Sequence, residues 1–245
     1  MKVEYFSGAA YLPAIGACAV ADVHIGIEAA LQAEGFAMPL DEEKLLRDKL
    51  RSVVERFAPE TMVLDGDVLH EFSRLRRDAK KSFDRILLAL LASADEVVLI
   101  TGSHDKMLDV ALEGAPIGVD GVRSEPFYFK GGALFCHGDA IPARAKEADV
   151  ELIVIGHDHP TLDVEMKKEP CFLYGKKAWR GKDVLMLPAF NPLCAGTSIN
   201  RLDSEDFLSP FLREGDVGAY RPIIEVEGET LEFPPLRDFR DVLEF

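Results

Sequence analysis

The chain has 245 residues, of which 48% are hydrophobic. That is enough for one large domain with a buried core, and it excludes a disordered chain. The 43 acidic residues outnumber the 28 basic ones and give a formal net charge of −15, which argues against tight non-specific binding of nucleic acid through its phosphates.

The four cysteines show no paired spacing. A Cys-x-x-Cys zinc or redox site is therefore excluded, and a reducing cytoplasm fits the chain. Residues 1–21 imitate a secretory signal, but Glu4 and Pro13 interrupt the segment and its basic part is the single Lys2. No apolar run approaches the about 18 residues that a membrane span needs. We therefore expect a soluble cytoplasmic protein without a membrane partner.

Short apolar runs alternate with amphipathic segments along the chain. The first run, residues 15–21, is expected to be a strand. Asp41 can cap a helix over residues 41–57, whose apolar side chains fall on one stripe. Ser73 can cap a second helix that runs to about Ala92. The further runs expected to be strands cover residues 62–64, 97–101, 133–136, 152–155, 171–174 and 184–187.

Buried strands that alternate with helices predict an α/β chain, with helices outside and sheets within. The last part of the chain differs, because residues 224–233 alternate apolar and polar side chains around Gly228 and predict a hairpin with one solvated face. No repeat, linker or domain boundary is visible. Residues 1–245 are therefore expected to form one domain, with a core over about 1–200 and an extension with the hairpin over about 201–245.

All six histidines lie in short motifs that follow or end an apolar run, and each motif also carries an aspartate. Imidazole and carboxylate groups are the nitrogen and oxygen ligands of divalent metals. In α/β folds, ligands bind beyond the carboxyl ends of strands. This distribution predicts a metal centre at one edge of a sheet. The motifs are Asp22-Val-His24, Asp65-Gly-Asp67-Val-Leu-His70, Gly102-Ser103-His104-Asp105, His137-Gly-Asp139 and Gly156-His157-Asp158-His159-Pro160.

The spacing within these motifs suits metal ligands. Asp22 and His24 are two residues apart, so in an extended chain they project to the same side. His157 and His159 repeat this spacing. Asp67 follows a glycine in a tight turn, where its two carboxylate oxygens could bridge two ions. Each motif alone is weak evidence, but five of them in order at strand ends favour a metal site over five structural coincidences.

The ordered series of motifs resembles the calcineurin-like metallophosphoesterase superfamily over residues from about 15 to 200. Finer features are similar to the SbcD-related archaeal phosphoesterases and to the bacterial phosphoesterases associated with DNA ligases. These finer features are His24-Ile-Gly-Ile-Glu28, Gly66-Asp-Val-Leu-His-Glu71, Ala178-Trp179-Arg-Gly181 and Leu187-Pro-Ala-Phe-Asn191.

The resemblance implies a four-layer α-β-β-α sandwich, in which two mixed sheets pack face to face between helices. It also implies two divalent metal ions, for which Mn²⁺ suits mixed nitrogen and oxygen ligands best, with Fe, Zn or Ni as alternatives. His104 would be the general acid or a transition-state contact, and Asp105 would orient it. The implied metal ligands are Asp22, His24 and His159 for one ion, His137 and His157 for the other, and Asp67 as the bridge.

One position departs from the family pattern. The family has asparagine where this chain has Ser103, and the asparagine side-chain carbonyl binds the second metal. A serine hydroxyl is shorter and a poorer neutral ligand. We therefore expect Ser103 to hold the second ion weakly or through a water molecule; the alternative is a tolerated exchange without functional effect.

The expected function is metal-dependent hydrolysis of a phosphodiester, with a phosphoester substrate that could be nucleic acid or a nucleotide. The first alternative is a phosphomonoesterase or a cyclic-nucleotide hydrolase with the same centre. The second is a non-catalytic scaffold that keeps the fold; Ser103 favours it, and the intact His104 and Asp67 oppose it. His70, three residues after Asp67 and expected at the start of a helix, is predicted to line the substrate cleft.

Overall fold

The computed structural model describes residues 1–36, 41–71, 74–115, 121–164, 167–226 and 228–240. Its first sheet has six strands in sequence order. The first three pair antiparallel, and the third to the sixth pair parallel. The strands are β1 (Glu4–Phe6), β2 (Ala9–Leu12), β3 (Ala17–Val20), β4 (Thr61–Asp65), β5 (Glu96–Ile100) and β6 (Val122–Glu125).

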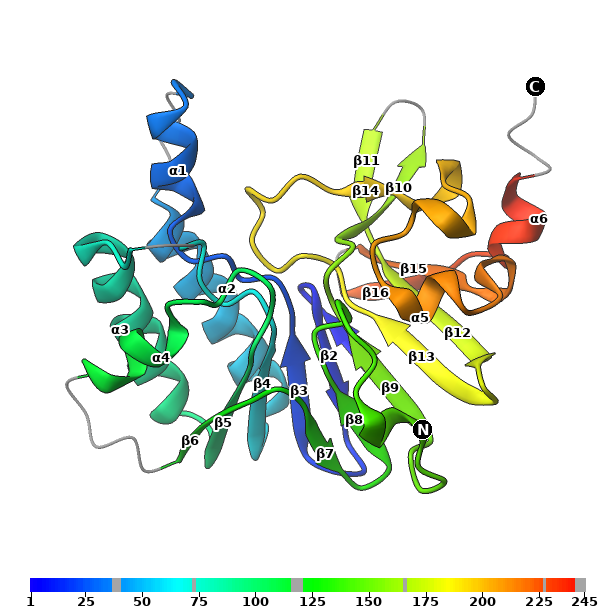
Figure 1. The fold of residues 1–245 in the computed structure, drawn as a ribbon, viewed down its shortest axis with the longest axis horizontal. Coiled ribbons are helices and arrows are strands. Elements are labelled where there is room, and N and C mark those ends of the chain that lie inside the picture. Colours follow the sequence, from blue (N-terminus) through cyan, green and yellow to red (C-terminus); the bar gives the residue numbers. More distant parts are fainter. Residues whose placement is uncertain (37–40, 72–73, 116–120, 165–166, 227, 241–245) are drawn as a thin grey trace.

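The parallel strands of this sheet are connected through helices that cover one of its faces (Figure 1). The predicted first helix is confirmed, because the side chain of Asp41 accepts a hydrogen bond from the Lys44 amide and its apolar stripe is buried. The second helix begins at Arg77, later than predicted, and Ser73 lies outside the described residues. The helices are α1 (Ile27–Ala33), α2 (Glu42–Phe57), α3 (Arg77–Leu91) and α4 (Leu108–Glu113).

The second sheet has seven strands in the order β16-β15-β12-β13-β9-β8-β7. The central strands β13, β9 and β8 pair parallel, and the outer ones pair antiparallel. The pairing of β15 with β16 confirms the predicted C-terminal hairpin. The strands are β7 (Tyr128–Lys130), β8 (Ala133–Phe135), β9 (Leu152–Ile155), β12 (Phe172–Trp179), β13 (Lys182–Met186), β15 (Arg221–Val226) and β16 (Glu229–Glu232).

A buried apolar cluster joins the two large sheets, since side chains such as Ala19 and Val63 of the first pack with Phe135 and Leu185 of the second. The mixed α/β class is therefore confirmed. The four-layer expectation is met only in part, because there is a third sheet and the helices beside the second sheet are short. The third sheet consists of β10 (Pro160–Val164), β11 (Lys167–Pro170) and β14 (Thr197–Ser198).

The remaining helices are single turns or little more. Buried side chains from this part of the chain, including Phe207, Phe211 and Leu236, pack with the outer face of the second sheet. No helix in the described part of the chain is both long enough and apolar enough to cross a membrane. The short helices are α5 (Pro210–Arg213), α6 (Leu236–Arg240) and the 3₁₀ turns Ala143–Lys146, Ile199–Arg201, Ser204–Asp206 and Val217–Ala219.

Candidate metal centre

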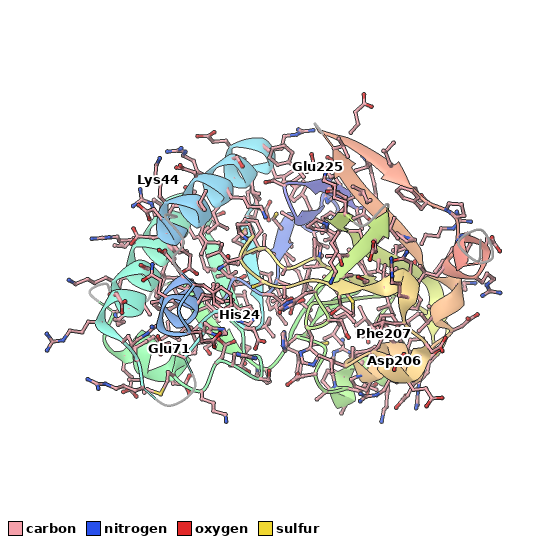
Figure 2. All side chains as sticks on the ribbon, turned by 90° about the horizontal axis from the view of Figure 1, so that it is seen from above. His24, Lys44, Glu71, Asp206, Phe207 and Glu225 are labelled. Carbon is pink, nitrogen blue, oxygen red and sulfur yellow. The ribbon has the colours of Figure 1, made fainter. Side chains whose placement is uncertain are left out.

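The histidine motifs lie at the carboxyl ends of parallel strands. In the first sheet, β3 ends just before Asp22, β4 just before Asp67 and β5 just before His104. In the second sheet, β8 ends just before His137 and β9 just before His157. A bridge between Ala21 and Ala189 links the two sheets at this edge. The predicted ligands therefore meet where the two sheets adjoin. Figure 2 shows His24 near the middle of the molecule.

Two groups of potential ligands share one carboxylate. Candidate ligand atoms of Asp22, His24 and Asp67 lie within 4.8 Å of one another, and so do those of Asp67, His137 and His157. The Oδ2 atom of Asp67 lies 3.4 Å from His137 Nε2 and 3.8 Å from His24 Nε2. Asp67 is thus the carboxylate that the two groups share.

The remaining predicted ligand, His159, lies beside the first group. Its Nε2 atom is 3.4 Å from His24 Nε2 and 3.4 Å from Asp22 Oδ1. Two nitrogen ligands of a tetrahedral ion, each 2.0–2.1 Å from it, lie about 3.3–3.4 Å apart. The spacing of the imidazoles therefore fits a shared cation.

Asp22 provides the clearest test of whether a cation fits. Its side chain is fully buried, and Oδ2 accepts a hydrogen bond of 3.0 Å from the His157 backbone N–H. Its Oδ1 has no hydrogen-bond partner among the described residues. A buried carboxylate oxygen without a donor is costly, and a coordinated cation removes that cost. A metal ion fits this position, because it would be ligated by the unpaired Asp22 oxygen and by the neighbouring imidazoles.

Burial and charge act differently on the two central imidazoles. Burial lowers the pKa of His24 to about 4, against the opposing effect of Asp22 and Asp67. Burial also disfavours the charged form of His137, yet the bond to Asp67 and the charge of Asp22 raise its pKa to about 10. The same carboxylates that retain a proton on His137 would attract a cation to this position.

The backbone at the site differs from the extended conformation that the spacing predicted. Asp22, His24, Asp67, His157 and His159 all have positive φ, between 44° and 80°. This left-handed conformation is uncommon for residues with side chains and accumulates at functional sites. Asp22 and His24 do share one ligand group, whereas His157 and His159 fall in different groups, the first with His137 and the second with His24.

Two glycines leave room for the ligands. Gly66 has a φ of 81°, and a Cβ atom on it would overlap the His137 imidazole. A Cβ atom on Gly102 would overlap the carboxylate and backbone of Asp67. Both positions therefore require glycine, the first for its backbone angle and both for the close approach of a ligand.

His104 lies at the mouth of the centre. Its backbone N–H donates to Asp67 Oδ1 at 2.8 Å, and its Nε2 is 3.8 Å from Asp67 Oδ2. Asp105 is buried and accepts hydrogen bonds of 2.9 Å from the N–H groups of Leu69 and Gly102. These bonds tie the loop that carries His104 to the loop that carries Asp67. The predicted action of Asp105 on the His104 ring stays a prediction.

His70 lies in the cleft, in a loop and not at the start of a helix as expected. Its Nδ1 atom is 3.3 Å from His24 Nδ1, and its ring stacks on that of His104 with centroids 5.4 Å apart. The cleft has a volume of about 270 Å³. The side chains that line it include His70, His104, Asp67 and Leu208. A larger cavity of about 530 Å³, between α2 and α3, is lined by none of the predicted site residues.

Ser103, the predicted ligand in place of asparagine, lies in the turn after β5 with an exposed side chain. The structure thus leaves it at the solvent side of the centre, while the neighbouring Asp67 is 2% exposed. Its role towards the second ion stays a prediction.

The sequence interpretation missed Cys194. Its sulfur lies within 4.8 Å of ligand atoms of His24 and His159. No local spacing in the sequence links Cys194 to these histidines, and its loop reaches them because β13, which precedes it, runs parallel to β9. The loop that follows β13 is held by Asn191, whose side-chain amide donates to Val23 O at 2.9 Å and to Glu42 Oε1 at 2.8 Å.

Comparison with protein-family models and with curated proteins gives no match. The fold is similar to the crystal structure of Pseudomonas putida nuclease MPE, with a TM-score of 0.62 and 21% sequence identity over 93% of this chain and 92% of that chain. At this identity the similarity shows a shared fold. A protein of unknown function from Aquifex aeolicus matches 58% of this chain and 78% of that chain, with 18% identity and a TM-score of 0.37, which is too low to support an argument.

Proposed function

We propose that the chain is a metal-dependent phosphoesterase that hydrolyses phosphodiesters at a centre of two divalent ions. The observation that carries the proposal is the place of Asp67 in both ligand groups, with Asp22 and His24 on one side and His137 and His157 on the other. A shared carboxylate is what distinguishes a pair of coupled ions from two separate sites. Mn²⁺ is the proposed ion for the nitrogen and oxygen ligands.

In this proposal Asp22, His24 and His159 hold one ion, His137 and His157 hold the other, and Asp67 bridges them. Two divalent ions held there would lower the pKa of a bound water and neutralise charge on a phosphoryl group. The protein itself fixes the ligands through strand ends that belong to two sheets. Burial of Asp22 and Asp67 removes competing water from the two carboxylates.

His104 is the proposed proton donor to the leaving oxygen. Its side chain is 29% exposed, whereas those of Asp67 and His137 are at most 3% exposed, so it faces an incoming substrate. No metal needs it as a ligand, because each proposed ion already has three protein ligands or more. His70, which stacks on His104, is proposed to contact the substrate.

The proposed substrate class is a phosphodiester, and nucleic acid is the candidate that the similarity to a protein named a nuclease supports. The formal charge of −15 opposes extended contact with a polyanion. We therefore propose that recognition is concentrated at the metal centre, as it would be for a strand end or a small phosphodiester.

The test compares bis-p-nitrophenyl phosphate, p-nitrophenyl phosphate and a short single-stranded DNA, each with chelator-treated protein and with added Mn²⁺, Fe²⁺, Zn²⁺ or Ni²⁺. We expect metal-dependent hydrolysis, faster with the diester than with the monoester. Preference for the monoester would identify a phosphomonoesterase. Inert protein with every ion would identify a non-catalytic scaffold.

A further inference from the structure

The loop after β13 brings a thiol to the metal centre. Cys194 donates its backbone N–H to Asn191 O at 3.1 Å, and its Sγ atom lies 4.0 Å from the backbone oxygen of Asp22. The Sγ atom and ligand atoms of His24 and His159 all lie within 4.8 Å of one another. A turn anchored by Asn191 thus fixes a sulfur beside two imidazoles.

A second observation at the same place points to a cation independently of the cysteine. The Oδ1 atom of Asp22 is buried, has no hydrogen-bond partner among the described residues and lies 3.4 Å from His159 Nε2. His159 Nε2 in turn lies 3.4 Å from His24 Nε2, which matches two nitrogens on one tetrahedral ion. The carboxylate oxygen therefore lies beside His159, one of the two histidines that the sulfur also approaches.

We infer that Cys194 is a protein ligand of the ion held by Asp22, His24 and His159, which makes this a site with nitrogen, oxygen and sulfur donors. The inference rests on the metal centre of the proposed function and goes beyond it in naming the ligand. Coordination exchanges the S–H bond for a sulfur–metal bond and releases the proton to solvent, without a change of oxidation state.

A thiolate ligand changes which ions the site prefers. Thiolates are soft ligands that suit zinc and similar ions, whereas Mn²⁺ favours carboxylate, carbonyl and water. On the Asp22 side this replaces the Mn²⁺ of the proposed function, because that side is then expected to bind Zn²⁺, Co²⁺ or Cd²⁺ in preference to Mn²⁺. The His137 side, for which the described residues offer nitrogen and oxygen donors, lacks this contribution from a thiolate.

The test is optical titration of the metal-free protein with Co²⁺. Visible d–d bands report that cobalt is bound, and a sulfur-to-cobalt charge-transfer band in the near ultraviolet reports a thiolate ligand. We expect both signals in the wild type and only the d–d bands in Cys194→Ser. Cys171→Ala, which alters a cysteine buried in the core of the second sheet, should keep both and serves as the control.

Affinity provides a second readout. Cys194→Ser should weaken Zn²⁺ or Cd²⁺ binding on the order of 10-fold or more and leave Mn²⁺ binding within a few-fold. Bound cobalt without a charge-transfer band, or a band that survives in Cys194→Ser, overturns the assignment of Cys194 while the metal centre stands. Failure of the wild type to bind cobalt overturns both the assignment and the metal centre.

Discussion

The Nε2 atoms of His24 and His159 lie 3.4 Å apart, although 135 positions separate the two residues in the chain. His24 follows a strand of the first sheet, and His159 follows a strand of the second. The contact depends on how the two sheets pack and on the left-handed backbone of both residues. It marks the point where the two halves of the chain together form one ligand set.

Metal binding is expected to stabilise the fold. An ion present at 100 times its dissociation constant contributes about 2.7 kcal/mol per site, which corresponds to a rise in Tm of about 5–10 °C for a chain of this size. The measurement is thermal unfolding in chelator and in saturating Mn²⁺. Identical Tm values in the two conditions would contradict a site formed by Asp22 and the histidines.

Asp67→Asn should remove the bridge between the ions. Loss of an outer partner of a metal ligand costs about 10–100-fold in affinity or activity, so we expect more than about 100-fold loss of activity here. Metal content should fall below that of the wild type by elemental analysis. Asp139→Asn, which alters an exposed aspartate two residues after His137, is the control; equal losses in both variants would exclude a bridging role.

His104→Ala should separate catalysis from metal binding. General acid catalysis contributes about 10²- to 10⁴-fold, so kcat with the diester should fall by that factor while calorimetry gives unchanged binding of Mn²⁺. An equal rate in variant and wild type would remove His104 from the reaction.

Ser103→Asn is expected to tighten the second metal site, because an amide oxygen reaches further and ligates better than a hydroxyl. Calorimetric titration of the metal-free protein with Mn²⁺ should show two affinities in the wild type, with the weaker one improved in the variant. Ser103→Ala serves as the control. Equal affinities in wild type and Ser103→Asn would show that the serine is a neutral exchange.

Gly66→Ala should disrupt the site sterically. Gly66 and Gly228 have similar φ values of 81° and 85°, but only at Gly66 would an added Cβ overlap the His137 ring; at Gly228 nothing lies within 4 Å. Backbone strain costs on the order of 1–3 kcal/mol in either variant. Urea unfolding should therefore show a greater loss of unfolding free energy for Gly66→Ala than for Gly228→Ala, and Gly66→Ala should also weaken Mn²⁺ binding. Equal losses of unfolding free energy in the two variants, with Mn²⁺ binding intact, would contradict the steric argument.

Much of the scaffold follows from the sequence. Asp41 and the apolar stripe after it predicted α2, and the alternation around Gly228 predicted the hairpin. The second helix was placed too early, because a residue able to cap a helix need not be followed directly by one. The third sheet was missed, since β14 has two residues and pairs with β10 only through tertiary packing.

The residues that follow each strand can be identified from the order of apolar runs and polar motifs alone, and the carboxyl ends of parallel strands lie at one edge of a sheet. For that reason Asp22, Asp67 and His137 could be predicted to lie close together, and their side chains do. Which atoms face one another follows from long-range packing: it depends on the left-handed backbone at the ligands, on glycines that allow close approach and on the contact between two sheets. Cys194 belongs to this second class, because no local spacing connects it to His24.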